Sequence, residues 1–119
     1  MNQWKLAVMT IFSLALLLFL HMKGMYGHWY LNFFFFDLIT HFLGGVGIAL
    51  SVLYVLKNPK YIIPLTFFAG VIWELFEVYY DLTGYPIVSL SYKLDTVKDI
   101  AMDILGAFTV WLVFKNKKQ

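Results

Sequence analysis

The 119-residue chain has no cysteine and no arginine, and only 13% of its residues are charged. Without cysteine, the protein has no disulfides, no thiolate metal ligands and no cysteine nucleophile. All nine basic residues are lysines, and a net charge of +2 is too small to indicate a nucleic-acid partner. Because lysine lacks the planar donor fork of arginine, a phosphate-clamping protein surface is also disfavoured.

Apolar and aromatic side chains, by contrast, are abundant. Hydrophobic residues make up 61% of the chain and aromatic residues 20%, whereas an average soluble domain is about 45–50% apolar. We therefore expect residues 1–119 to form a single integral membrane domain without a separate soluble domain. The expected fold is all-α, a polytopic bundle of four transmembrane helices in the plasma membrane. The lipid bilayer is then its first partner, and a homo-oligomer stays open.

Four apolar runs predict the transmembrane helices. They lie at about residues 4–22, 30–56, 61–80 and 96–114, with an outer loop over 81–95. About 20 residues suffice to cross a hydrocarbon core of ~30 Å. The first run is followed by no small-residue cleavage site, so we interpret it as a retained anchor and not as a signal peptide.

Two further expectations concern the second and fourth spans. Residues 30–56 are too long for an upright crossing, which predicts a tilt or a bend near Gly44, Gly45 and Gly47. Asp95 or Thr96 is expected to cap the start of the fourth helix.

The lysines predict the orientation. Six of the nine fall on one side of a four-span bundle, and these are Lys5, Lys57, Lys60, Lys115, Lys117 and Lys118. By the positive-inside rule both termini are predicted to be cytoplasmic.

Acidic residues enter three of the predicted spans at helical spacing. Asp37 precedes His41 by four residues, and the segment from Asp95 to Gly106 (DTVKDIAMDILG) repeats aspartate every four residues. Glu74 and Glu77 are three residues apart. Residues three or four apart share one helix face, so each pair points in one direction. Counted from the outer surface, the three pairs lie at the same depth, and three helices can direct carboxylates at one point.

Such a cluster needs compensation inside a membrane. Each uncompensated charge costs at least ~2.5 kcal/mol on insertion scales. Lys98 is predicted to point about 100° away from Asp99, so no lysine lies on the acidic stripes. Protonation, water or a bound cation must therefore compensate, and a metal ion is a natural counter-charge. The expected metal ligands are Asp37, His41, Glu74, Glu77, Asp99 and Asp103.

The donor types restrict the metal and the chemistry. Carboxylates with an imidazole suit Mn, Fe or Zn, and an all-oxygen subset suits Mg or Ca. If the protein is an enzyme, which the sequence leaves open, we expect it to act on a lipid or lipid-linked headgroup. A metal-activated water would be the nucleophile, with Glu74 or Glu77 as the general base.

Three non-enzymatic alternatives are compatible with the sequence. A network of shared protons and waters among the acids could tie three helices together without a metal. A proton or ion pathway is less favoured because the inner halves of the spans are apolar. The protein could also serve as a partner of a larger envelope complex.

Three blocks carry a resemblance to a known group. The segments FDLITHFLGG, WELFEVYYDL and LDTVKDIAMDILGA, which lie between Phe36 and Ala107, resemble the small bacterial membrane proteins of the YjdF type. More loosely, the chain is similar to VanZ-like proteins. The resemblance implies a recurring site without a named reaction. Its signature positions in this chain are Asp37, His41, Glu74, Glu77, Asp95 and Asp99.

Overall fold

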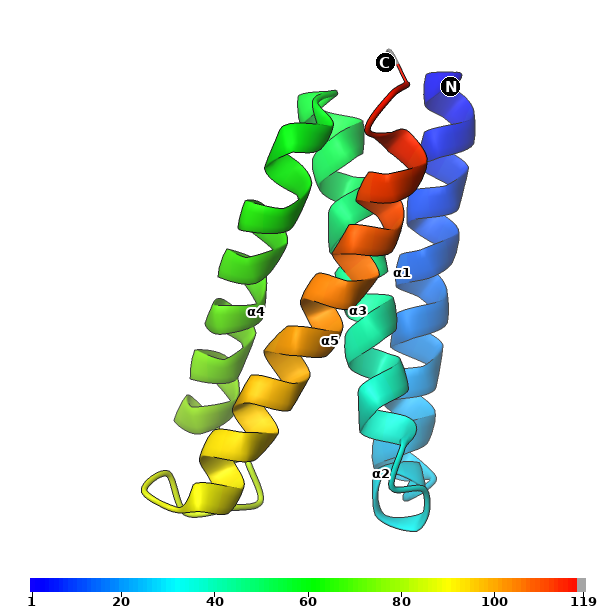
Figure 1. The fold of residues 1–119 in the computed structure, drawn as a ribbon. Helices are drawn as coiled ribbons and strands as arrows, with labels where there is room; N and C mark the ends of the chain where they lie inside the picture. The colour runs from blue at the N-terminus through cyan, green and yellow to red at the C-terminus, as the bar shows by residue number, and fades with distance from the viewer. Residues whose placement is uncertain (118–119) are drawn as a thin grey trace.

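The computed structural model describes residues 1–117, and over that range the protein contains helices and turns only. Four long helices form a bundle, with a short helix and a 3-10 turn in the connections (Figure 1). The elements are α1 (Gln3–Tyr26), α2 (Trp29–Asn32), α3 (Phe36–Leu56), η1 (Pro59–Tyr61), α4 (Ile62–Tyr79) and α5 (Leu90–Phe114).

The four long helices run alternately up and down, so α1 begins and α5 ends at the same end of the bundle (Figure 1). Helix α5 packs against both α3 and α4, and α1 packs along α3. The molecule measures 45 × 28 × 22 Å. Its long axis therefore accommodates a bilayer core of ~30 Å with both rims.

Within residues 1–117, three stretches are long and apolar enough to cross a membrane: Gln3–Tyr26, Phe36–Leu56 and Pro59–Tyr79. The expectation of an all-helical membrane protein is confirmed in this form. Helix α5 has 25 residues, but its first half carries lysines and aspartates, and by composition it is not among the three.

The second span differs from its prediction. The chain does not form one helix over 30–56, because it turns at Phe33, which has extended backbone angles after α2, and α3 begins at Phe36. The 21 residues of α3 correspond to about 31 Å, which matches a hydrocarbon core. The remaining residues of the predicted span therefore form an aromatic turn before the start of α3, and α3 needs no tilt or bend to match the bilayer.

The start of α5 also differs from its prediction. Neither Asp95 nor Thr96 caps the helix, because Ser89 is the N-cap and its Oγ accepts a hydrogen bond of 3.1 Å from the Tyr92 backbone N–H. Serine is among the best N-cap residues. The connection from α4 is correspondingly shorter than the predicted loop over 81–95, and Asp95 lies inside the helix.

The two ends of the bundle differ in character. The end with the termini holds an apolar core, formed by Leu6, Ala49, Leu50, Leu53, Ile62, Ala107, Val110 and Phe114. Towards the opposite end, the buried side chains include four ionisable ones, His41, Glu74, Asp99 and Asp103, together with Phe36 and Thr40.

Close packing of α3 on α5 joins these two halves. A Cβ atom on Gly45 would fall on the main-chain carbonyl of Asp103, and one on Gly106 would fall on that of Phe42. Each helix thus presents a glycine to the backbone of the other. Gly45 makes this close approach from α3, whereas its neighbour Gly44 does not.

Candidate functional site

Three helices bring the ionisable residues together at the end of the bundle opposite the termini. Asp37 and His41 lie in the first two turns of α3, and Glu74 and Glu77 lie near the end of α4, which runs the other way. The remaining two residues, Asp99 and Asp103, come from α5. The equal depths expected from sequence are consistent with the contacts that follow.

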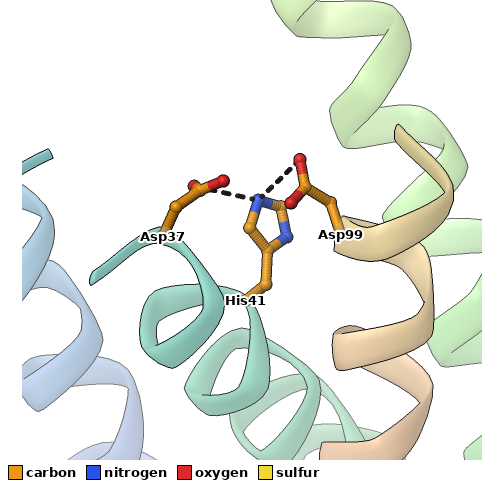
Figure 2. A group of neighbouring side chains, drawn as sticks. All are labelled: Asp37, His41 and Asp99. Atoms are coloured by element: carbon orange, nitrogen blue, oxygen red, sulfur yellow. Dashed lines mark ion pairs between the residues drawn. The ribbon is translucent and has the colours of Figure 1, made fainter. Parts of the chain in front are cut away.

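His41 lies at the centre of the first group, between three carboxylates. Its Nε2 is 3.6 Å from Asp37 Oδ1 and 3.5 Å from Asp99 Oδ2, while its Nδ1 hydrogen-bonds Asp103 Oδ1 at 3.1 Å. Figure 2 shows the Asp37 and Asp99 carboxylates facing the same ring nitrogen. The imidazole is 8% exposed.

These distances distinguish the two sides of the imidazole. The contact with Asp103 is a hydrogen bond, whereas those with Asp37 and Asp99 exceed the ~3.2 Å usual for one. Two ligands of a tetrahedral ion with bonds of about 2.1 Å lie about 3.4 Å apart. The spacing around Nε2 therefore resembles that of a ligand set, and Asp103 orients the imidazole from its other side through Nδ1.

A second group lies beside the first. One ligand atom from each of Glu74, Glu77 and Asp99 falls within 4.8 Å of the other two, as does one from each of Asp37, His41 and Asp99. Asp99 belongs to both groups. Five of the six predicted ligands are thus in position to share one or more cations, and Asp103 stands behind them.

Donors from α4 and α5 hold the two glutamates by one oxygen each. The Trp73 indole N–H donates to Glu77 Oε1 at 3.0 Å, and Thr96 Oγ1 donates to Glu74 Oε2 at 3.3 Å. Fixing one oxygen of a carboxylate orients the other toward whatever the site binds. Sequence reasoning missed both donors, although the spacing of Trp73 and Glu77, four residues apart, could have indicated the first.

Two buried oxygens of the cluster have no hydrogen-bond partner among the described residues: Glu74 Oε1 and Asp99 Oδ1. Glu74 is 6% exposed and Asp99 is 2% exposed. A buried carboxylate oxygen without a hydrogen bond is costly to desolvate, and of the two only Asp99 Oδ1 has a charged neighbour, Lys98 Nζ at 3.8 Å. The two oxygens are therefore positions where a cation or an ordered water would stabilise the fold.

Lys98 corrects one prediction. It was expected to point away from the acids, yet its Nζ lies 2.8 Å from Asp95 Oδ1, 3.5 Å from Asp37 Oδ2 and 3.8 Å from Asp99 Oδ1. The helical wheel fixes only the direction of the Cα–Cβ bond, and the four-carbon stem of lysine reaches back across the surface. The cluster therefore contains one ammonium group at its mouth.

Gly70 makes room for Asp103 between α4 and α5. A Cβ there would lie 2.7 Å from Asp103 Oδ2. Asp103 Oδ1 forms the hydrogen bond to His41 Nδ1. A side chain at position 70 would displace this carboxylate, so the glycine allows Asp103 to orient the imidazole.

Next to the cluster, His21 of α1 hydrogen-bonds through Nδ1 to the Tyr30 hydroxyl at 2.9 Å. Burial raises the pKa of the Tyr30 phenol, which therefore stays protonated at neutral pH. The His21 ring also meets the edge of Trp73, at 6.1 Å between ring centroids. His21 thus packs against Trp73, the residue that orients Glu77.

Comparison with known proteins gives a family but no described function. The model of a family described as predicted membrane protein (DUF2238) matches residues 1–118. No curated protein matches the chain. No solved structure matches it either.

Proposed function

The chain belongs to this family of membrane proteins, and we propose that it binds a divalent metal ion in the acid cluster and uses it on a lipid or lipid-linked headgroup. The observation that carries the proposal is the pair of buried oxygens without a hydrogen bond, Glu74 Oε1 and Asp99 Oδ1, in a cluster that also presents His41 Nε2. Mn, Fe or Zn suits this set of imidazole and carboxylates, and Mg or Ca suits the all-carboxylate part.

The residues divide into ligands and a base. Asp37, His41 and Asp99 would hold the ion, with Asp103 keeping the imidazole in orientation through Nδ1. When bound, the ion supplies a Lewis acid that polarises an oxygen of the substrate. Glu77 is half-buried whereas Glu74 is enclosed, so Glu77 is the better placed of the two to take a proton from water.

We further propose that α5 is a fourth crossing, with both termini cytoplasmic and the acid cluster in the outer half of the plasma membrane. Helix α5 packs along α3 and α4, and its length of 25 residues is sufficient. Five of the six lysines assigned to the inner side lie at the end with the termini, and the sixth, Lys118, lies outside the described residues. We also propose that the chain is related to the YjdF-type proteins and, more distantly, to the VanZ-like proteins.

A structural role without metal is the second candidate. Carboxylates flank both nitrogens of His41, and Lys98 bridges three aspartates. An imidazolium and an ammonium among these acids would tie α3 to α5 as a charged network. An ion pathway is supported less, because the apolar core closes the opposite end of the bundle.

Metal binding distinguishes these candidates directly. We expect the full-length protein, purified in detergent without chelator, to retain a divalent metal in elemental analysis. At a free metal concentration 100 times the Kd, the ion should stabilise the fold by about 2.7 kcal/mol. Thermal unfolding followed by circular dichroism, with and without each of Mn, Fe, Zn, Mg and Ca, measures this effect.

Asp81→Asn is the control, because Asp81 is the one acidic residue outside the cluster. Its backbone is left-handed, a conformation that asparagine tolerates. The variant should bind metal like the wild type. Absence of bound metal together with absence of any metal-dependent stabilisation would refute the proposal in favour of the structural network.

Replacing Trp73 with phenylalanine should weaken metal binding about 10- to 100-fold, the usual effect of losing a second-shell partner. The change removes the indole N–H that donates a hydrogen bond to Glu77 Oε1. It keeps an aromatic ring in the position that packs against the His21 ring. Titration calorimetry of the purified variant measures the affinity.

Trp111→Phe is the matched control for this experiment. Trp111 stacks on Phe108 in the half of α5 near the termini and makes no hydrogen bond to the cluster within the described chain. Equal losses in the two variants would mean that the indole N–H plays no part in the site.

A further inference from the structure

We infer that the cluster holds two divalent ions bridged by Asp99, and that this pair of ions binds a phosphate ester. The inference rests on the proposed metal site and deepens it, because it specifies the number of ions and the chemical class of the substrate.

The two ligand groups overlap at Asp99. Asp37 and His41 approach from α3, Glu74 and Glu77 approach from α4, and Asp99 of α5 belongs to both sets. The Asp99 carboxylate faces His41 Nε2 with Oδ2, while its Oδ1 is buried without a hydrogen bond. A carboxylate that belongs to both ligand groups, and that has one oxygen free of hydrogen bonds, can bridge two ions.

The negative charge of the cluster is closer to balance with two divalent ions than with one. Six of the seven acidic residues of the chain lie in or beside the cluster, and only Asp81 lies elsewhere. Asp95 is paired with Lys98 at 2.8 Å, which leaves five carboxylates for cations when His41 is a neutral ligand. One divalent ion would leave three negative charges in a poorly solvated site, whereas two ions would leave one.

A pair of ions in this site is suited to a phosphate ester as substrate. Two metal ions about 3.5–4 Å apart clamp the attacking and leaving oxygens of an in-line displacement, as they do in phosphatases and nucleases. The chain has no arginine to bind a phosphate, so the positive charge must come from the ions and from Lys98. The Lys98 ammonium, 3.5 Å from Asp37 and 3.8 Å from Asp99, would lie beside both ions at the mouth.

The number of ions is tested with Mn²⁺ alone, on the full-length protein in detergent, by equilibrium dialysis and elemental analysis. We expect about two ions per chain in the wild type and in Asp81→Asn. His41→Ala and Glu77→Gln should each retain about one, because each removes a ligand from one group only, and Asp99→Asn should lose both. Electron paramagnetic resonance should show an exchange-coupled Mn pair in the wild type and isolated ions in His41→Ala and Glu77→Gln.

These outcomes separate the inference from the proposal on which it rests. About one ion per wild-type chain with an uncoupled spectrum would overturn the bridged pair and leave a single-metal site intact. Absence of ions would overturn both. Circular dichroism and size-exclusion chromatography identify a variant that fails to fold, and the wild-type stoichiometry and spectrum decide the question even then.

The phosphate part is tested on the Mn-loaded protein. Inorganic phosphate should alter the coupled spectrum, whereas chloride or sulfate at equal ionic strength should not. Phosphatidic acid in phosphatidylcholine vesicles and soluble glycerol 3-phosphate then separate the two sources of a phosphate ester. A response to the vesicles assigns a lipid headgroup, and a response to the soluble ester alone assigns a water-soluble substrate. No response to any phosphate probe would overturn this part.

Discussion

Replacing Gly45 with alanine is expected to lower the free energy of unfolding by about 3 kcal/mol or more, whereas the same change at Gly44 should leave it unchanged or slightly raised. The new Cβ at Gly45 would fall on the main-chain carbonyl of Asp103, and neither backbone can move without separating α3 from α5. Overpacking of this kind usually costs about 1–3 kcal/mol, and more when backbone atoms are involved.

Gly44 is a closely matched control, since it is the adjacent residue on the same helix. The nearest atoms to a Cβ there lie 3.9 Å away, an ordinary van der Waals distance, and alanine favours a helix over glycine by about 1 kcal/mol. Unfolding in mixed micelles, followed by circular dichroism, compares the two variants. Equal stability of the pair would show that α3 and α5 do not pack through Gly45.

Replacing Lys98 with methionine is expected to destabilise the metal-free protein and to increase its affinity for divalent metal about tenfold. Without the ammonium, Asp37, Asp95 and Asp99 lose their shared positive partner. A metal ion in the same place would then no longer be repelled by a neighbouring cation, an effect of about 1.4 kcal/mol for a tenfold change. Methionine preserves much of the apolar stem, so packing is largely retained.

Titration calorimetry and thermal unfolding, each with and without metal, measure these two effects. The metal-loaded variant should recover the stability of the metal-loaded wild type. Lys93→Met is the control, because Lys93 lies on the same helix but is exposed and forms no ion pair within residues 1–117. Destabilisation that no metal reverses would favour the structural network over the metal site.

Helical spacing in the sequence was sufficient to predict the helices and most of the site. The pairs Asp37/His41, Glu74/Glu77 and Asp99/Asp103 depend on the period of the helix and on alternating helix direction, which the apolar runs define. The structure accordingly brings five of these residues into two overlapping groups with ligand atoms within 4.8 Å of one another, and Asp103 into a hydrogen bond with His41.

Other features depend on side-chain length and on contacts between helices, to which helical spacing is insensitive. The Lys98 side chain curves back so that its ammonium group reaches the acids. Thr96 of α5 donates a hydrogen bond to Glu74 of α4. The choice between Gly44 and Gly45 depends on a rotation of α3 by one residue, which is finer than an apolar pattern can define. The turn at Phe33 and the early start of α5 at Ser89 are local choices among residues that could equally well continue or interrupt a helix.

The unequal ends of the bundle have an electrical consequence. With seven carboxylates and three lysines toward one end and five of the described lysines at the other, the protein is a dipole along its long axis. Moving one elementary charge through a potential of 100 mV changes its energy by about 2.3 kcal/mol. If the lysine end faces the negative side, the resting voltage favours this orientation and draws a divalent cation inward from the opposite surface. Occupancy of the acid cluster would then follow the energised state of the membrane as well as the concentration of the ion.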